Sequence, residues 1–341
     1  MRQLKEAKFY RKRLNKKVEC YLCARRCVIP EGKTGFCFVR KNIDGVLFTL
    51  TYARLTPINI SPIERKPMYH FYPDSKWLSV GSLGCNFRCK GCQNYEIACI
   101  TKIEENLFKT EYIEPQDLVN LAKTYKTKGI SFTYNEPTIQ IEYILEVSKL
   151  AKSQGLLTNW VTNASINPEV LKEIIDFIDS YRADIKGFSK DTYEKVANFT
   201  EFNEILKNVE FAFKKGVWVE IVTNIIPTLN DDLEELKNLA LWIKNNLSEN
   251  VPWHITRFFP YFKLKNLYPT PIKTLQKIRE MALEIGLKYV YIGNVNLKEA
   301  NNTYCPKCKS LLVERDQVSV IKNFLSKGEC PVCGYEIPGR Y

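Results

Sequence analysis

The sequence is poor in histidine: of its 341 residues, only His70 and His254 are of this type. Metal-dependent hydrolysis and Ser/His/Asp catalysis both draw on histidine, so neither is expected here. A Walker-type phosphate loop and a glycine-rich dinucleotide fingerprint are also missing from the sequence. The chemistry of this chain must therefore come from other side chains.

Long apolar runs are missing as well. No run approaches the roughly 20 residues that span a bilayer, and the N-terminus has no apolar segment of the secretory-signal kind. We therefore expect a cytoplasmic protein with no membrane partner. The length allows one large domain with small appendages, because a single core stops growing at roughly 250 to 300 residues.

Cysteine, in contrast, is abundant, with twelve residues that cluster along the chain. They form three groups: Cys20, Cys23, Cys27 and Cys37; Cys85, Cys89, Cys92 and Cys99; and Cys305, Cys308, Cys330 and Cys333. Close spacing in a reducing compartment indicates metal ligation, whereas disulfides would need an export signal that is missing.

The formal net charge of +12 overstates the basicity, because thiolates bound to metal are negative. The densest basic segment is MRQLKEAKFYRKRLNKK, residues 1–17. Lysine-rich termini usually serve solubility, so nucleic-acid contact is the alternative interpretation of this segment.

From about Trp77 onward, short β-branched runs alternate with amphipathic segments of helical length. Strands are expected over 77–83, 129–134, 156–163, 181–188, 217–226, 252–259 and 288–295, and helices over 115–126, 138–155, 167–179, 191–197, 204–216, 231–246 and 271–286. This alternation predicts an α/β fold with a parallel sheet wrapped by helices, a partly or fully closed barrel of the (βα)6 type. We expect an N-terminal Cys-rich module over 1–74, the barrel over 75–299 and a four-cysteine, zinc-ribbon-like module over 300–341.

In such folds the chemistry lies where the strands end. Polar residues follow or end most of the predicted strands. We expect these residues to lie together around one end of the barrel, its mouth, where the strands finish: Cys85, Asn135, Glu136, Asn163, Asp184, Lys186 and His254.

The most specific motif is GCNFRCKGCQNYE, residues 84–96, with cysteines spaced Cys-x3-Cys-x2-Cys. Three thiolates, Cys85, Cys89 and Cys92, can hold three irons of a [4Fe–4S] cube and leave the fourth iron open for a ligand. The nearest other thiol, Cys99, lies in the apolar run IACIT. We expect it to be a buried core residue, and a role as a fourth ligand is the less favoured alternative.

This loop resembles that of the radical S-adenosylmethionine (SAM) superfamily, specifically its pyruvate formate-lyase activating enzyme group, and is most similar to the radical SAM enzyme of the AmmeMemoRadiSam system. The resemblance rests on GCNFRCKGCQNYEIA, FTYNEPTI, VTN, ADIKGF, IIPTLND, PWHITRFFP, YIGNV and NTYCPKC.

The resemblance implies a [4Fe–4S] cluster that chelates SAM and cleaves it reductively, to methionine and a 5′-deoxyadenosyl radical that abstracts hydrogen from a substrate. It implies a protein substrate, with Memo-like and AMMECR1-like proteins as candidate partners, and a reductant such as ferredoxin or flavodoxin. RNA or a small metabolite is the alternative substrate. A metal-binding scaffold for nucleic acid is the alternative outside enzymes.

The resemblance also assigns cofactor-binding roles to named residues. Those expected along the methionine amino group are Tyr134, Asn135 and Glu136. Those expected near the ribose and carboxylate are Asn163, Asp184 and Lys186. His254 is expected near the nucleoside. Each has a simpler interpretation, since asparagines form turns and Glu136 could be a solvated loop residue.

The chain departs from the family pattern at three positions. Gly91 stands where an aromatic residue usually packs on adenine, so Phe87 and Tyr95 are the candidates for that wall. Ala164 and Thr228 stand where relatives often have glycine, which predicts altered loop conformations there.

The flanking cysteine groups differ in regularity. Cys305-x2-Cys308 and Cys330-x2-Cys333 predict a tetrahedral four-thiolate site, more often zinc than a single rubredoxin-like iron. For Cys20, Cys23, Cys27 and Cys37, zinc and a second iron–sulfur cluster are about equally compatible with the sequence.

Overall fold

The computed structural model describes residues 4–316 and 318–341; the first three residues of the basic N-terminal segment lie outside these ranges. Its centre is an eight-stranded sheet in the order β16-β15-β14-β13-β12-β11-β9-β8. These strands are β8 (Ile58–Pro62), β9 (Lys76–Val80), β11 (Gly129–Phe132), β12 (Leu157–Thr162), β13 (Ser180–Asp184), β14 (Trp218–Ile225), β15 (Trp253–Arg257) and β16 (Val290–Gly293).

From β9 to β16 every neighbouring pair is parallel, whereas β8 pairs with β9 antiparallel. The parallel strands follow one another in sequence order, as β/α alternation predicts. The sheet has two separate end strands, β8 and β16, so it is a partial barrel with one parallel strand more than six.

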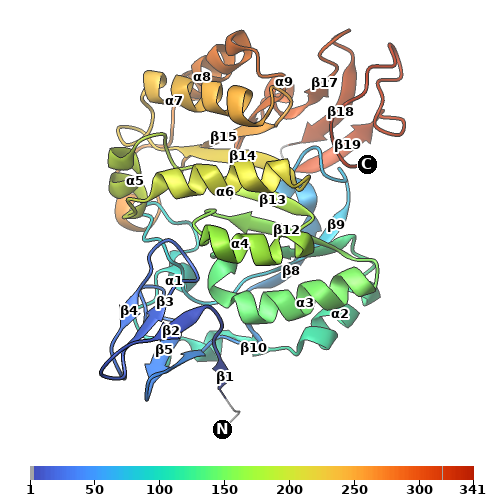
Figure 1. Ribbon diagram of the computed structural model, residues 1–341. Helices are drawn as coiled ribbons and strands as arrows, with labels where there is room; N and C mark the ends of the chain where they lie inside the picture. Colours follow the sequence, from blue (N-terminus) through green and yellow to red (C-terminus); the bar gives the residue numbers. More distant parts are fainter. Residues whose placement is uncertain (1–3, 317) are drawn as a thin grey trace.

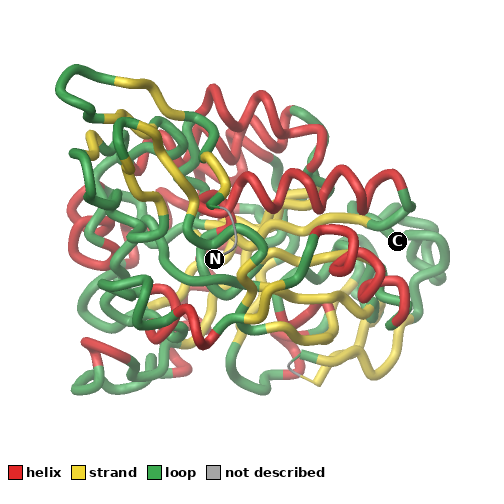
Figure 2. The backbone as a smooth tube through the Cα atoms, turned by 90° about the horizontal axis from the view of Figure 1, so that it is seen from below, coloured by secondary structure: helices red, strands yellow, loops and turns green. Residues whose placement is uncertain are grey.

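Helices cover the outer side of this sheet (Figures 1 and 2). They are α2 (Pro115–Thr124), α3 (Ile141–Ser153), α4 (Pro168–Ile174), α5 (Lys190–Ala197), α6 (Phe202–Lys214), α7 (Leu233–Trp242) and α8 (Ile272–Ile285). Two shorter helices are α1 (Tyr95–Ala98), which follows the three-cysteine segment, and α9 (Lys298–Asn301), which precedes the C-terminal strands. Helix starts follow the sequence signals: Pro168 opens α4 while the Asn167 side chain accepts from the Glu169 amide, and Asp232 caps α7.

The N-terminal part consists of short antiparallel sheets. One has the order β1-β6-β5 and the other β2-β3-β4, and a further pair joins β7 to β10. The strands are β1 (Lys5–Glu6), β2 (Tyr10–Lys12), β3 (Val18–Cys20), β4 (Val28–Ile29), β5 (Arg40–Ile43), β6 (Val46–Thr49), β7 (Arg54–Leu55) and β10 (Glu111–Tyr112).

This N-terminal part lies against the segment that follows β12. The Ala24 amide donates to the Ser165 carbonyl at 2.9 Å, and the Asn167 amide donates to the Leu22 carbonyl at 3.0 Å. The N-terminal cysteines are thereby held at the end of the sheet where the strands finish.

The C-terminal strands β17 (Thr303–Tyr304), β18 (Leu311–Asp316) and β19 (Ser319–Asn323) form a three-stranded antiparallel sheet away from the N-terminal part (Figure 1). Buried Arg315 of β18 donates to the Tyr69 carbonyl at 3.0 Å and so ties this sheet to the chain before β9. Among the described residues, no helix combines the length and apolarity needed to cross a membrane.

Candidate functional site

The three-cysteine loop follows β9 and begins at Gly84. Gly84 has φ +83°, and a Cβ there would lie 2.5 Å from the Cys37 carbonyl oxygen, so only glycine fits. Its amide donates to the Ile97 carbonyl at 2.7 Å, which closes the loop onto α1. Cys85, Cys89 and Cys92 are each partly exposed.

Asn135, three residues after the end of β11, joins its own loop to this one. Its side-chain oxygen accepts from the Ser82 amide at 3.1 Å, and its Nδ2 donates to the Gly84 carbonyl at 3.0 Å. Asn94 makes the reverse connection, since its Nδ2 donates to the Tyr134 carbonyl at 2.7 Å. The first and second strand ends are thus held together by side-chain amides.

Glu136 is buried and accepts four hydrogen bonds. Its Oε1 accepts from the Thr138 amide and hydroxyl and from the Thr162 hydroxyl, and its Oε2 accepts from the Asn163 amide at 2.8 Å. Burial raises the pKa of Glu136, and these donors oppose that rise. Glu136 is therefore a buried anchor between β11 and β12, not the solvated loop residue that the simpler interpretation allowed.

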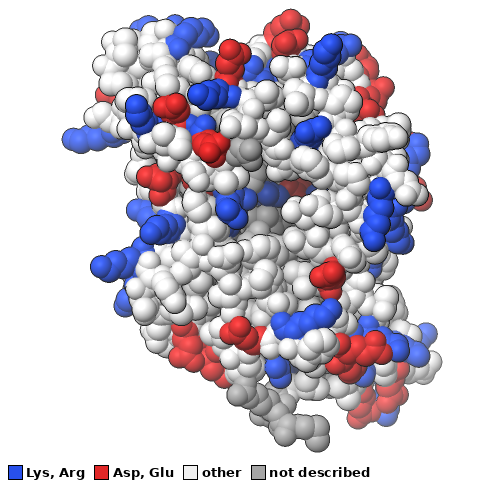
Figure 3. All heavy atoms as spheres, turned by 180° about the vertical axis from the view of Figure 1, so that it is seen from behind, with Lys and Arg blue, Asp and Glu red and all other residues white. Residues whose placement is uncertain are grey.

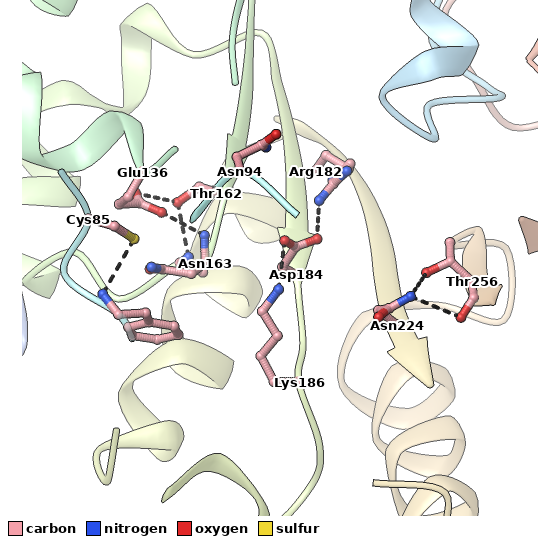
Figure 4. Close-up of polar contacts among 12 residues, drawn as sticks. Cys85, Asn94, Glu136, Thr162, Asn163, Arg182, Asp184, Lys186, Asn224 and Thr256 are labelled. Atoms are coloured by element: carbon pink, nitrogen blue, oxygen red, sulfur yellow. Dashed lines mark hydrogen bonds and ion pairs between the residues drawn. The ribbon is translucent and has the colours of Figure 1, made fainter. Parts of the chain in front are cut away.

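Asn163 extends this network to the cysteine loop. Its Nδ2 donates to the Oδ1 of Asn86, the residue after Cys85, at 2.8 Å, while its own Oδ1 accepts from the Ser165 amide and hydroxyl. Figure 4 shows Cys85, Glu136, Thr162 and Asn163 grouped together.

Asp184 lies between two cations at the end of β13. It pairs with Arg182, and its Oδ2 lies 2.8 Å from the Lys186 Nζ (Figure 4). Burial opposes the ionisation of Asp184, but the two neighbouring cations outweigh this effect and lower its pKa. Burial also opposes the charge on Lys186, but Asp184 and, to a smaller extent, the Cys89 thiol raise the pKa of Lys186. The Asp184 carboxylate and the Lys186 ammonium are therefore both charged, and they lie near Cys89 of the three-cysteine loop.

Arg182 was not among the residues singled out from the sequence. The sequence does contain a signal for Arg182, because Arg182, Asp184 and Lys186 alternate within the strand expected over 181–188 and would share one face of it.

The structure does not bring His254 together with these residues. Its ring is 1% exposed, and its Nε2 lies 2.6 Å from the Oε2 of Glu220 in β14. It packs against Tyr69 and Tyr291, with centroids 4.7 Å and 5.2 Å away. Burial lowers the pKa of His254, which keeps the ring neutral. This is a second buried polar cluster that periodicity alone could not separate from the first.

The expected aromatic wall is only partly in place. Phe87 is 1% exposed and packs on Phe199 at 4.6 Å, so it belongs to the core and the expectation for it was wrong. Tyr95 is partly exposed and stacks on Phe262 at 4.8 Å. At Gly91 a Cβ would meet the Phe258 ring at 3.0 Å, so Phe258 fills the space beside this glycine.

Ala164 and Thr228 keep the backbone conformation that favours glycine. Their φ values are +58° and +68°, in the left-handed region. Side chains are therefore accommodated at both positions in a backbone conformation that strains them.

The four C-terminal cysteines converge on one point. Their Sγ atoms all lie within 4.8 Å of one another, with Cys305 to Cys333 and Cys308 to Cys330 each 3.6 Å apart. No covalent link joins these thiols. The arrangement can hold a metal ion.

The molecule's charge is mixed on the face seen from behind. Lys and Arg side chains there alternate with Asp and Glu instead of forming one basic patch, and the face is hollowed near its centre (Figure 3). This view gives no support to the scaffold interpretation, which needs a continuous basic surface.

The comparisons with known proteins agree with this geometry. Residues 79–243 match the radical SAM superfamily. The uncharacterized protein MJ0808 of Methanocaldococcus jannaschii is 40% identical over 98% of this chain and 99% of its own length. The pyruvate formate-lyase-activating enzyme of Clostridium pasteurianum is 29% identical over 60% of this chain and 87% of its own.

Among solved structures, Streptococcus suis SuiB bound to S-adenosylmethionine superimposes with a TM-score of 0.51 at 12% identity, covering 66% of this chain and 52% of SuiB. This likeness establishes the fold. The chain belongs to the radical SAM superfamily, and its homologues include glycyl-radical activating enzymes.

Proposed function

We propose that this chain is a radical SAM enzyme of the activating-enzyme kind, which generates a radical on a protein substrate. The observation that carries the proposal is the loop of Cys85, Cys89 and Cys92 at the end of β9, fastened by Asn135 and Asn163 to the next two strand ends. A purely structural metal site would not need this support from two other strands.

The residues present fit a [4Fe–4S] cluster with one open iron. Three partly exposed thiols lie on one loop, and the nearby Lys186 supplies positive charge beside the Cys89 thiolate. Cys99 hydrogen-bonds to Cys92, so it lies within the loop's surroundings, and we assign it no ligand role. When bound, the cluster and SAM supply one-electron cleavage of a sulfonium and thereby a carbon radical able to take hydrogen from a substrate.

The chain's own residues would divide the work of binding and positioning. Lys186 offers a cation, 19% exposed, for the carboxylate of SAM, and Asp184 holds its ammonium in place. We propose that Tyr134, Asn135, Glu136 and Asn163 complete the SAM site, with Glu136 acting through the Asn163 backbone because its own oxygens are already bonded. His254 is left out of this proposal, since its ring is committed to Glu220.

For the C-terminal cysteines we propose zinc. Four sulfurs at about 2.3 Å from a tetrahedral zinc lie about 3.8 Å apart, close to the 3.6 Å separations here. In this reading residues from about 300 form a ribbon whose metal substitutes for a core that so short a segment cannot build.

A protein substrate is supported by the activating-enzyme homologues. The AmmeMemoRadiSam resemblance makes Memo-like and AMMECR1-like proteins the first candidates, with ferredoxin or flavodoxin as reductant and the cytoplasm as location.

The test is anaerobic. Reconstituted and reduced protein is mixed with SAM and assayed for 5′-deoxyadenosine, alone and with each candidate substrate protein. Formation of 5′-deoxyadenosine, lost in the Lys186→Met variant with iron retained, supports the proposal. Iron-loaded wild type that yields no 5′-deoxyadenosine under any of these conditions contradicts it.

A further inference from the structure

The four N-terminal cysteines surround a pocket. Cys20, Cys23, Cys27 and Cys37 line it, with apolar walls from Leu22, Ile29, Phe36 and Ile139. Three of the four thiols are buried. Arg25, Arg40 and Asn86 complete the polar lining, so the four thiols share the pocket with cationic and amide donors that suit an anionic metal–sulfur group.

The spacing of the sulfurs separates this group from the C-terminal one. Among the described residues, Cys305, Cys308, Cys330 and Cys333 form the single set whose ligand atoms all lie within 4.8 Å, and no three of the N-terminal thiols meet that limit. One zinc ion requires such closeness, because all four thiolates touch the same atom. In a cubane each thiolate binds a different iron, so the sulfurs stand farther apart around a central space.

A buried arginine faces the same pocket. Arg40 lines it, is 1% exposed and pairs with Glu142 at 2.8 Å. Its Nε and Nη1 have no partner among the described residues. Unpaired buried donors are costly, and the inorganic sulfides of a cluster would accept from them.

The pocket adjoins the three-cysteine loop. Asn86, the residue after Cys85, is one of its lining residues. Arg88 clamps the two loops, donating to the Cys85 carbonyl at 2.7 Å and to the Phe36 carbonyl at 2.5 Å. The Cys37 carbonyl lies against Gly84.

We infer that Cys20, Cys23, Cys27 and Cys37 hold a second [4Fe–4S] cluster beside the three-cysteine loop. In that position it relays single electrons: it takes one from an external low-potential iron–sulfur or flavin protein and passes that one to the group on Cys85, Cys89 and Cys92. The electron-transfer role of this second cluster rests on the function proposed above, whereas its binding by the four N-terminal cysteines does not.

The test removes the first site and looks for the second. The C85A/C89A/C92A variant is reconstituted anaerobically, and its iron, sulfide and zinc are counted. About four irons and four sulfides per chain, with an electron paramagnetic resonance signal of a reduced [4Fe–4S] cluster that SAM does not change, are expected. The reciprocal variant, with Ser at all four N-terminal cysteines, is expected to keep about four irons and a SAM-sensitive signal. If that variant does not fold, wild type with about eight irons gives the same information.

An iron-free C85A/C89A/C92A protein with about two zincs would overturn the inference in favour of zinc, and a single iron per chain would overturn it in favour of a rubredoxin-like site. The relay predicts that reduced wild type shows magnetic coupling between two clusters, absent from both variants; uncoupled clusters would overturn the relay. A wild type that makes no 5′-deoxyadenosine, while the variant keeps its cluster, would refute only the proposed function.

Discussion

The Nδ2 of Asn163 donates to the Oδ1 of Asn86 at 2.8 Å, and this bond joins the end of β12 to the residue that follows Cys85. Asn86 is itself 1% exposed, and its Nδ2 donates to the Ser165 hydroxyl at 2.8 Å. The loop that carries the three thiols is thus positioned by buried amides on a neighbouring strand end.

Asn86→Ala is expected to lower the free energy of unfolding by about 2 kcal/mol, because it leaves the Asn163 amide buried without its partner. Urea unfolding of the metal-loaded protein measures this, and a double-mutant cycle with Asn163→Ala should give a coupling of about 1 kcal/mol. Asn238→Ala, on the exposed face of α7, is the control and should cause no loss. Additive effects of the two asparagine variants would contradict the network.

Replacing any one of Cys85, Cys89 or Cys92 with Ala is expected to remove the SAM-responsive cluster and all SAM cleavage. The reason is that the cluster stays bound, with its fourth iron free for SAM, only when each of the other three irons is bound by a thiolate. Iron counting and the 5′-deoxyadenosine assay check this in each variant. Cleavage that survives in any of them would refute the assignment of that thiol as a ligand.

Cys305→Ser is expected to release zinc and to destabilise the C-terminal strands, because the remaining three thiolates no longer complete the tetrahedron. Zinc analysis and limited proteolysis after about residue 300 report on both effects. Ser310→Ala, next to Cys308 but not a proposed ligand, is the control and should keep its zinc. A stable, zinc-free Cys305→Ser protein that has lost activity would instead assign this site a functional role.

Stability is expected to fall in mild acid on account of His70. Burial lowers the pKa of His70 to about 4; in the neutral ring Nδ1 donates to the Pro338 carbonyl, and Nε2 accepts from Tyr291. The unfolded state protonates near the ordinary pKa of about 6.5, so the contribution is complete above that pH and is lost as the pH falls to about 4. The loss amounts to about 3 kcal/mol. Unfolding of wild type and His70→Gln between pH 7 and 4 should converge at the acid end; parallel curves would contradict it.

Thr228→Gly is expected to stabilise the protein by about 0.5 kcal/mol. A β-branched residue in the left-handed region costs about 1–2 kcal/mol, which exceeds the entropy that glycine adds to the unfolded chain. The matched control is Thr274→Gly within α8, where glycine should cost about 0.3 kcal/mol, the difference between the helix propensities of glycine and threonine. Thermal unfolding compares the two, and a loss of stability at position 228 would contradict the argument.

Much of the framework could be predicted because it depends on local patterns. The parallel strands coincide with apolar runs seen in the sequence, and the helices expected over 167–179 and 231–246 begin at Pro168 and Leu233. The three-cysteine loop was predictable too, since its spacing confines three thiols to one short segment. Partners contributed by distant strands were not predictable in this way: Asp184 was expected at the mouth, but nothing local distinguished its neighbourhood from that of His254.

The sequence by itself determined the alternation of strands and helices and the grouping of the cysteines, because each depends on spacing within a few residues. Only the tertiary structure decided that Phe87 turns into the core and that His254 pairs with Glu220. It also decided that the C-terminal thiols converge while the N-terminal ones surround a space. The physical reason is that the distance between two side chains far apart in sequence is set by the packing of the elements that carry them, and no local pattern encodes that packing.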